Sequence, residues 1–343
     1  MMTWNTARHV ASGDADIQRS CADSSRGDVA AADPWRMQAA KHRRWDVLCV
    51  GAPCAHNGVA VDRPPAGGGM GFGRPLGIDL GGAAANVACA VSRLGWNSAM
   101  LGLICDDANG RLCRASFAHF QVDAEMLEVI DRGAADCKVA PVASGGRRAT
   151  MRVPLPNTLQ LRRGMSQSRL VYAKPGDAEE LSYIGSLARA EGTILAVDME
   201  RAFAPNEHEM RRCLAPADIV FFDEESFLKA MGLPPSPYAL ASLLADRPRT
   251  VVVTRGGAGA VAADRTGFTS HPAFDRIVVD PAGAGDSFIA AFLCASLAGE
   301  SIAQAVRFAC AAASFTVGAL GARAGLPDRF QVNRFLRCSA APA

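Results

Sequence analysis

Short apolar runs alternate with helical patterns through the second half of this chain. Buried strands are predicted at 170–173, 193–197, 218–222 and 250–254, and the first three are each followed by a segment with helical spacing. Neighbouring parallel strands need a crossover of this kind, whereas an antiparallel pair can be joined by a short turn. The pattern therefore predicts a mostly parallel sheet with helices on both faces.

The flanking segments indicate where the folded domain begins and ends. We expect one domain over 45–336, because apolar periodicity is found throughout that range. Residues 1–44 have no such period and predict a disordered extension, and 337–343 form a short tail. Glycines and prolines punctuate the segments 58–79 and 138–162, which are predicted to form a small β lid.

Composition excludes several classes of protein. The chain has 343 residues and a formal net charge of +2, and no basic run is interleaved with aromatic residues, so no nucleic-acid partner is expected. The eleven cysteines include no CxxC pair, which favours reduced thiols over a disulfide framework. No apolar run approaches the roughly 20 residues of a membrane span. We therefore expect a cytoplasmic protein, without a membrane partner, that acts on a small molecule.

A turn of small residues precedes an apolar helix in the last third of the chain. A β-branched run predicts a strand at 276–279, Gly283, Ala284 and Gly285 form the turn, and a helix is predicted from Ala284. Backbone N–H groups at a helix N-terminus can approach an anion closely, and the helix dipole favours negative charge there. At the same helix start lies Asp286, where the dipole lowers the pKa of a carboxylate. Such an aspartate suits a general base in phosphoryl transfer, although a simple helix cap beside a tight loop would use the same residues.

The stretch from Asp280 to Phe288 resembles the C-terminal signature of the PfkB (ribokinase-like) carbohydrate kinase family. Other stretches agree with that family in order along the chain. They are the glycine motif at 81–88 with Leu94 and Gly95 after it, the loop at 252–260, the helix at 307–312 and the loop at 321–327. The resemblance implies a ribokinase-like three-layer α/β/α sandwich with a mostly parallel central sheet and a small β lid.

The resemblance also implies an activity and its site. A member of this family transfers phosphate from ATP, with Mg²⁺, to an alcohol group of a sugar or nucleoside. Here Asp286 would be the base, and the N–H groups of Gly283, Ala284 and Gly285 would form the anion hole. The substrate-binding residues implied are Gly82, Asn86, His56 and Asn57, and the nucleotide-binding residues implied are Thr254, Gly256, Gly259, Cys310 and Asp223. Many relatives form homodimers through the lid, and the sequence is compatible with a homodimer.

Several positions depart from the family pattern. The aspartate that usually follows the first strand is His56 here, with Asn57 next to it, and neither side chain is an acceptor-only carboxylate. The NxxE motif near the phosphates reads Asp-Glu-Glu-Ser at 223–226, which leaves Asp223 or Glu225 to bind Mg²⁺. The family often binds a monovalent cation such as K⁺, which would make Asp280 a ligand. A strand-end aspartate in a turn is the equal alternative for that residue.

Motifs separate the remaining functions. A GxGxxA match at 257–262 is followed by a turn within ten residues, so no helix could carry the pyrophosphate of a dinucleotide. The P-loop pattern GxxxxGK[ST] does not occur in the sequence. Two alternatives to a sugar kinase stay open. They are a nucleoside kinase of the same family and a relative that binds or regulates without turnover.

Overall fold

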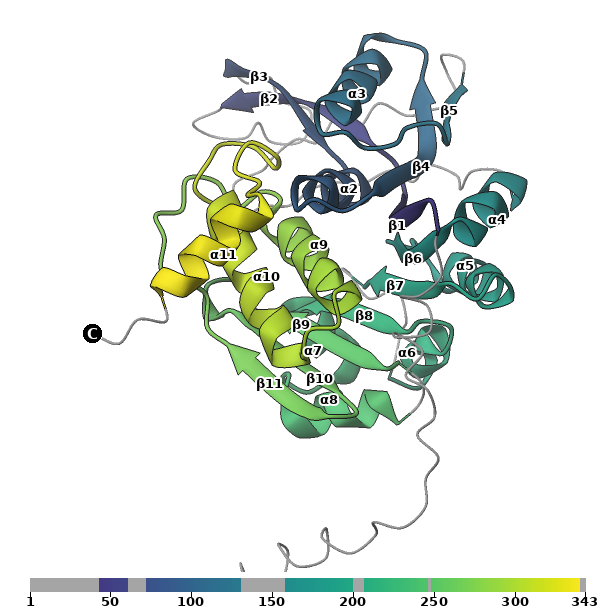
Figure 1. Cartoon of the computed structure of the whole chain (residues 1–343), viewed down its shortest axis with the longest axis vertical. Coiled ribbons are helices and arrows are strands. Elements are labelled where there is room, and N and C mark those ends of the chain that lie inside the picture. The colour runs from purple at the N-terminus through teal and green to yellow at the C-terminus, as the bar shows by residue number, and fades with distance from the viewer. Residues whose placement is uncertain (1–42, 61–71, 131–157, 200–206, 246–247, 340–343) are drawn as a thin grey trace, which may run out of the picture.

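The computed structural model describes residues 43–60, 72–130, 158–199, 207–245 and 248–339. Its centre is a nine-stranded sheet of order β11-β10-β9-β8-β7-β6-β1-β4-β5 (Figure 1). All neighbours from β9 to β5 in this order are parallel, whereas β10 and β11 are antiparallel additions at one edge. The predicted mostly parallel sheet is confirmed.

The strands coincide closely with the buried apolar runs of the sequence. They are β1 (Trp45–Val50), β4 (Ser98–Cys105), β5 (Leu127–Ile130), β6 (Ser168–Ala173), β7 (Ile194–Asp198), β8 (Ile219–Asp223), β9 (Thr250–Thr254), β10 (Ala260–Asp264) and β11 (Gly267–His271). The central strands are buried along almost their whole length, as expected for parallel strands between two helical layers.

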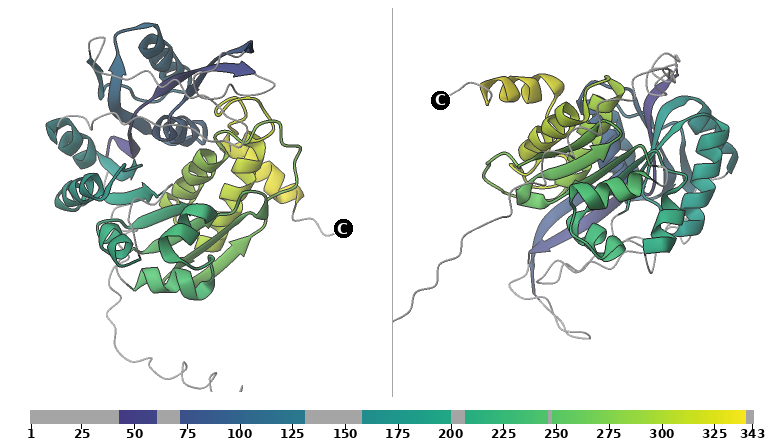
Figure 2. Two further views of the ribbon diagram at one scale, coloured as in Figure 1. Left: turned by 180° about the vertical axis from the view of Figure 1, so that it is seen from behind. Right: turned by 90° about the horizontal axis from the view of Figure 1, so that it is seen from below.

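Helices cover both faces of the sheet (Figure 2). One layer consists of α2 (Ala83–Arg93), α3 (Ala108–His119), α9 (Ala284–Leu297), α10 (Ile302–Thr316) and α11 (Arg329–Cys338). The other consists of α4 (Thr158–Ser166), α5 (Ala178–Ala190), α6 (Glu207–Leu214), α7 (Glu224–Met231) and α8 (Pro237–Leu244). Each layer buries its own apolar cluster against one face of the sheet. The result is the expected three-layer α/β/α sandwich.

Local sequence determines where several helices begin. Asp107 starts α3 and Asp177 starts α5, and each carboxylate accepts a backbone N–H of its own first turn at 2.8 Å. Ser301 and Gln304 form a reciprocal capping box at the start of α10. In the described part of the chain, no helix is long and apolar enough to cross a lipid bilayer.

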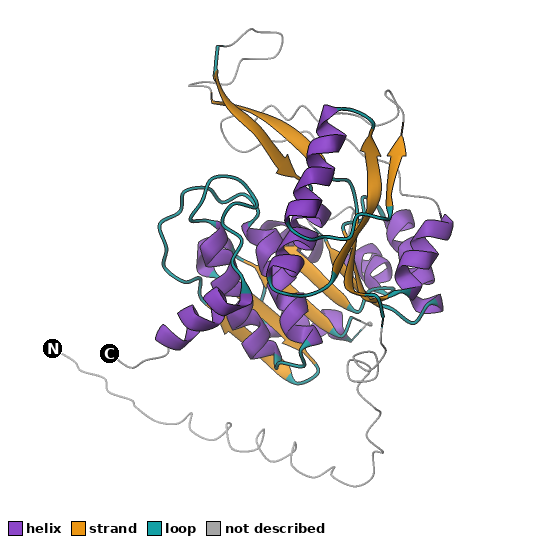
Figure 3. Ribbon diagram, turned by 45° about the horizontal axis from the view of Figure 1, so that its top comes forward, coloured by secondary structure: helices purple, strands orange, loops and turns teal. Residues whose placement is uncertain are grey.

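A separate two-stranded antiparallel sheet projects beyond the main sheet (Figure 3). It consists of β2 (Cys54–Ala60) and β3 (Arg74–Gly81), and the chain passes from β3 almost directly into α2. His56 lies opposite Asp79 in its register. This sheet occupies the first predicted lid segment. The connection at 61–71 and most of the second segment, 138–157, lie outside the described residues.

Two secondary-structure predictions were wrong. Residues 276–279 form no strand, and Ile277 is 86% exposed. The N–H of Val279 donates to the carbonyl of Val317 at the end of α10, at 2.8 Å, and not to a neighbouring strand. The β-branched run therefore lies outside the sheet. The end of the predicted second lid segment is the start of helix α4. That helix buries Leu161 and Met165, whose spacing of four residues is helical.

Candidate active site

The carboxyl ends of the parallel strands meet at one edge of the sheet. Lys174 follows β6, while β7, β8 and β9 end at Asp198, Asp223 and Thr254. In open α/β sheets, ligands bind outside this edge. Helix α9 packs against α2 beside it (Figure 1), which brings the two glycine motifs of the sequence together.

The turn before α9, at 281–285, is the predicted anion site. Gly283 is the N-cap residue with φ 76°, and a side chain there would collide with the carbonyl of Ala322. The N–H of Ala284 already donates to Pro281, at 3.3 Å. Among the described residues, the N–H groups of Gly283 and Gly285 donate to no protein acceptor. Two of the three expected anion-hole groups are therefore available to a ligand.

Asp286 lies in the first turn of α9, directly after this turn of small residues. Its carboxylate is half-buried, and Oδ2 accepts a hydrogen bond from Nδ2 of Asn86 at 2.8 Å. The helix cap is Gly283, so Asp286 is not the capping residue that the sequence also allowed. The structure thus brings the predicted base and one predicted substrate-binding residue into direct contact.

A buried arginine lies behind Asn86. Arg323 is only 7% exposed, and its Nε donates to Oδ1 of Asn86 at 2.8 Å. The other two nitrogens donate to Oγ of Ser116 at 2.8 Å and to the carbonyl of Gly81 at 3.0 Å. Asn86 itself is 5% exposed, with its amide engaged at both ends. Its remaining amide hydrogen could still donate to a substrate.

Neutral and charged groups surround the base on the side of the sheet. Burial raises the pKa of Tyr172 well above its usual value, and the charges of Asp198 and Asp286 raise it further. The pKa of the Cys49 thiol is raised for the same main reason, burial, with a contribution from Asp286. Both groups are therefore neutral at pH 7. Asp198 accepts the Tyr172 hydroxyl at 3.3 Å and forms an ion pair with Lys174 at 3.3 Å.

The expected nucleotide-binding residues lie around the end of β9. Thr254 ends the strand, and a single 3-10 turn at Gly256–Ala258 follows it. Gly259 has φ 88°, and a side chain there would collide with the carbonyl of His271. A Cβ at Gly256 would meet only open space. Cys310 is buried in α10, where burial raises the pKa of its thiol to about 12.

The carboxylates expected to bind cations differ in how many hydrogen bonds they accept from the protein. Asp223 caps α7, accepting the N–H of Ser226 at 2.7 Å and its hydroxyl at 2.9 Å. Asp280 accepts the N–H of Ala282 and that of Gly321, both at 2.9 Å. Glu225 is exposed in the first turn of α7. The contacts with Ala282 and Gly321 place Asp280 in the turn, and its role as a cation ligand stays a prediction.

The described residues contain no group of three His, Cys, Asp or Glu side chains that could hold a metal ion. Magnesium does not need one, because it usually keeps several waters and takes one or two carboxylates together with substrate phosphates. Glu225 and Asp223 at the sheet edge could supply those one or two carboxylates. They are too few to bind a metal ion without ligands from substrate or water.

The remaining predicted substrate residues lie on the small sheet and at the start of α2. Gly82 has φ 94°, and a side chain there would collide with the carbonyl of Ala52. This conformation turns the chain into α2 and lets Gly82 accept the N–H of Asn86 at 2.8 Å. His56 and Asn57 belong to β2, within the projecting sheet.

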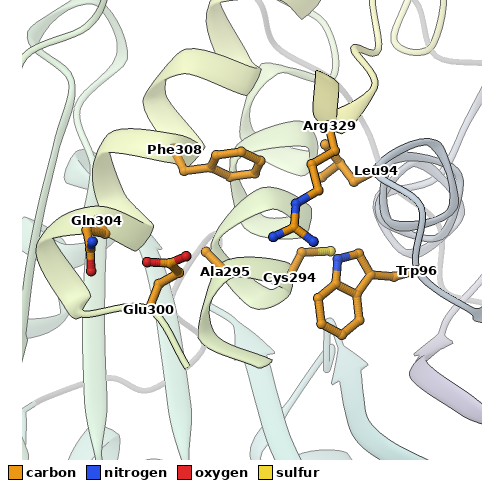
Figure 4. A pocket seen from close by; sticks show the side chains of 8 residues that line it. All are labelled: Leu94, Trp96, Cys294, Ala295, Glu300, Gln304, Phe308 and Arg329. Atoms are coloured by element: carbon orange, nitrogen blue, oxygen red, sulfur yellow. The ribbon is translucent and has the colours of Figure 1, made fainter. Parts of the chain in front are cut away.

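A surface pocket lies at the opposite end of α9 from Asp286 (Figure 4). Cys294 and Ala295 from the last turns of α9 form its floor, and Trp96, Phe308 and Arg329 form part of its walls. Its empty volume is about 350 Å³. Because Asp286 is in the first turn of the same helix, this pocket is separate from the candidate site.

Comparison with known proteins decides the family. The family model for pfkB family carbohydrate kinases matches residues 73–329. The chain belongs to the pfkB family of carbohydrate kinases. That range includes α2, the loop after β9, the turn before α9 and the loop that carries Arg323.

Among curated pfkB relatives, the ATP-dependent ribose-1-phosphate kinase of Halopiger xanaduensis is 29% identical over 318 residues, covering 88% of this chain and 98% of that protein. The fructokinase of Salmonella typhimurium is 28% identical over 286 residues, covering 74% and 91%. In structure, the ribokinase of Arabidopsis thaliana, solved with ribose and ATP, aligns with a TM-score of 0.73 over 85% of this chain and 99% of that one, at 22% identity. This likeness confirms the ribokinase-like fold.

Sequence reasoning does not find every residue of the candidate site. Arg323 belongs to the loop at 321–327 without any signal of its own, and Asp198 lies just beyond the predicted strand at 193–197. A signal for Asp198 existed, because a polar residue at the carboxyl end of a parallel strand is a candidate site residue. Nothing local marks Arg323, whose partners Gly81, Asn86 and Ser116 are more than 200 positions away.

Proposed function

We propose that this protein transfers the γ-phosphoryl group of ATP to a hydroxymethyl or other alcohol group of a sugar or sugar-like substrate, with Asp286 as general base. The observation that carries the proposal is the position of Asp286, which directly follows two available backbone N–H groups in the chain and accepts a hydrogen bond from the amide of Asn86. Asn86 donates to Oδ2 of this carboxylate and so fixes the direction in which it points.

The reaction needs little covalent chemistry from the protein. Asp286 accepts the proton of the acceptor hydroxyl as the hydroxyl oxygen bonds to the γ-phosphorus. The bond from that phosphorus to its bridging oxygen breaks, and ADP leaves with the electron pair. N–H groups of Gly283 and Gly285 would donate to the transferred phosphoryl group, whose charge they and the α9 dipole stabilise.

The nucleotide would lie along the loop after β9, where glycines leave the backbone uncovered at 256–257. Mg²⁺ bound with ATP would neutralise phosphate charge. Glu225 and Asp223 are the carboxylates that would bind this Mg²⁺. The small sheet of β2 and β3 would close over the acceptor and exclude water, so that the phosphate reaches the substrate hydroxyl instead of solvent.

A substrate panel tests the proposal. The full chain is mixed with MgATP and D-ribose, D-fructose, ribose 1-phosphate or a set of nucleosides, and ADP formation is followed by a coupled assay. We expect acceptor-dependent ADP with a sugar or sugar phosphate and no such ADP from Asp286→Asn. Turnover with nucleosides alone would indicate a nucleoside kinase. This alternative is specific because a nucleoside kinase of Methanothermobacter thermautotrophicus is 28% identical to this chain. Ligand binding without any ADP would indicate a non-catalytic relative.

A further inference from the structure

Arg323 is a charged side chain that the proposed reaction does not yet use. It lies in the loop between α10 and α11 and is 7% exposed, although an unpaired buried charge is costly. Its hydrogen-bond acceptors, the Asn86 amide, the Ser116 hydroxyl and the Gly81 carbonyl, are all neutral. Because none of these acceptors is a carboxylate, a direct ion pair does not explain why this charged side chain is buried.

The chemistry of the guanidinium fixes the orientation of Asn86. Arginine can only donate hydrogen bonds, so the end of the amide that faces Arg323 must be the oxygen. The NH₂ group of the same amide must then face Asp286, to which it donates at 2.8 Å. With the amide turned the other way, an amide oxygen would face the carboxylate, and two acceptors would repel each other.

The same loop also holds the anion site. Gly321 donates its N–H to Asp280, and the carbonyl of Ala322 lies against Gly283, so closely that only glycine fits there. Arg323 is the next residue and reaches Asn86 and Gly81. Three consecutive residues therefore connect the anion-site turn, the base and the glycine motif at the start of α2.

We propose that Arg323 is a positioning residue for the catalytic base, which it orients through the amide of Asn86 and stabilises in the ionised state with its positive charge. This inference rests on the proposed role of Asp286. Arg323 is almost fully buried, and it acts through Asn86 and the field of its charge.

The charges around Asp286 make this contribution measurable. On the sheet side, Tyr172 and Cys49 are neutral at pH 7, because burial raises the pKa of each. Asp198 is also on that side, but its charge is paired with Lys174. On the helix side, burial likewise raises the pKa of the Cys89 and Cys113 thiols near Arg323, to about 11. Arg323 is thus a fixed positive charge on that side, one amide away from the base.

A structural role alone would give different results from a positioning role. If Arg323 only closed the loop onto Gly81 and Ser116, its loss would lower the free energy of unfolding without moving the pH profile of turnover. If it positions the base, the loss lowers kcat, leaves the KM for ATP unchanged and raises the pKa of Asp286. Because the base must be deprotonated, the acid limb of the kcat profile then moves to higher pH.

The experiment compares Arg323→Met, Arg323→Lys and the surface control Arg329→Met in the full chain, with the acceptor found in the substrate panel. We expect Arg323→Met to lower kcat by about tenfold or more, with the acid limb shifted upward. Arg323→Lys keeps the charge but not the planar fork, and it guards against a failure of the methionine variant to fold. We expect it to lower kcat less, but measurably. Wild-type kcat and pH profile in the lysine variant would overturn the proposal.

A double-mutant cycle with Asn86→Ala isolates the path through the amide. If Arg323 acts through Asn86, adding Arg323→Lys to Asn86→Ala lowers kcat by far less than it does in the wild type. Fully additive effects on kcat would contradict the path through Asn86. Asp286→Asn in the same series separates the two claims. Normal turnover in that variant defeats the proposed function, whereas its loss together with an unaffected Arg323→Lys defeats only the role of Arg323.

Discussion

The carboxylate of Asp280 accepts the backbone N–H of Gly321 at 2.9 Å, across 41 positions of sequence. Its other oxygen accepts the N–H of Ala282, so one side chain fastens the anion-site turn to the loop before α11. Asp280 therefore has a structural role beside the turn that precedes Asp286.

Asp280→Ala leaves two backbone N–H groups without their acceptor. We expect the free energy of unfolding to fall by about 1–3 kcal/mol, and turnover to fall with it because the turn loses its fixed position. Chemical denaturation with and without K⁺ checks the cause. The loss should be the same in both, whereas a loss seen only with K⁺ would support the cation-ligand interpretation of Asp280.

Asp286→Asn keeps the shape of the side chain and removes the proton acceptor. We expect kcat to fall by at least ~100-fold, in line with the loss of a general base. ATP binding should persist, and the unfolding free energy should change by less than about 2 kcal/mol, since one charged hydrogen bond is weakened. Steady-state kinetics and calorimetry with ATP measure both effects. Near-normal kcat would remove Asp286 from the chemistry.

Gly283→Ala and Gly285→Ala form a matched pair for backbone strain. Gly283 has φ 76° and no room for a Cβ, so the first variant should lose more than about 1 kcal/mol of unfolding free energy. Gly285 is helical with open space around it, so the second should be neutral or stabilised by up to about 1 kcal/mol. Equal destabilisation of both variants would contradict the geometry of the turn.

Asp223→Ala removes the cap of α7, whereas Glu225→Gln removes only an exposed charge in its first turn. The first should lower the unfolding free energy by about 1 kcal/mol or slightly more. The second should leave stability within about 0.5 kcal/mol and raise the KM for MgATP if Glu225 is a magnesium ligand. Kinetics over a range of Mg²⁺ concentrations separate the capping role from the metal role.

Alkaline pH should destabilise the fold through its buried thiols. Burial raises the pKa of Cys310 from 9.0 to about 12, so between these values the unfolded chain has lost a proton that the folded chain retains. Stability from this group is therefore complete below pH 9 and is lost as the pH rises toward 12. Denaturation at pH 8 to 11 tests this, with Cys310→Ala expected to show a smaller decline. An identical decline in that variant would exclude Cys310 as a source.

The fold was predictable because its signals are local. The runs at β6 to β9 are short and apolar, their helices have regular spacing, and parallel topology follows from the alternation. The segment at 276–279 has the same β-branched composition, yet it is exposed and pairs with the end of α10. Composition cannot distinguish these cases, because burial depends on which edge of the sheet the chain has reached.

The site was predictable in its parts but not in its connections. Small residues at 283–285 and a carboxylate at the helix start indicate an anion site and a base. Both ends of the Asn86 amide, by contrast, are engaged by residues that lie 200 and 237 positions away. No periodicity or motif spacing encodes such contacts. Pairing within the small sheet, which sets Asp79 opposite His56, is similarly invisible until the register is known.

The long separation between these partners also affects synthesis of the protein on the ribosome. The amide that orients the base is near the beginning of the domain, and the arginine that orients the amide is near its end. A nascent chain in which Asp286 has already left the ribosome still lacks Arg323. Catalytic competence should therefore arise late in synthesis, only after the loop that carries Arg323 has left the exit tunnel and packed against α2.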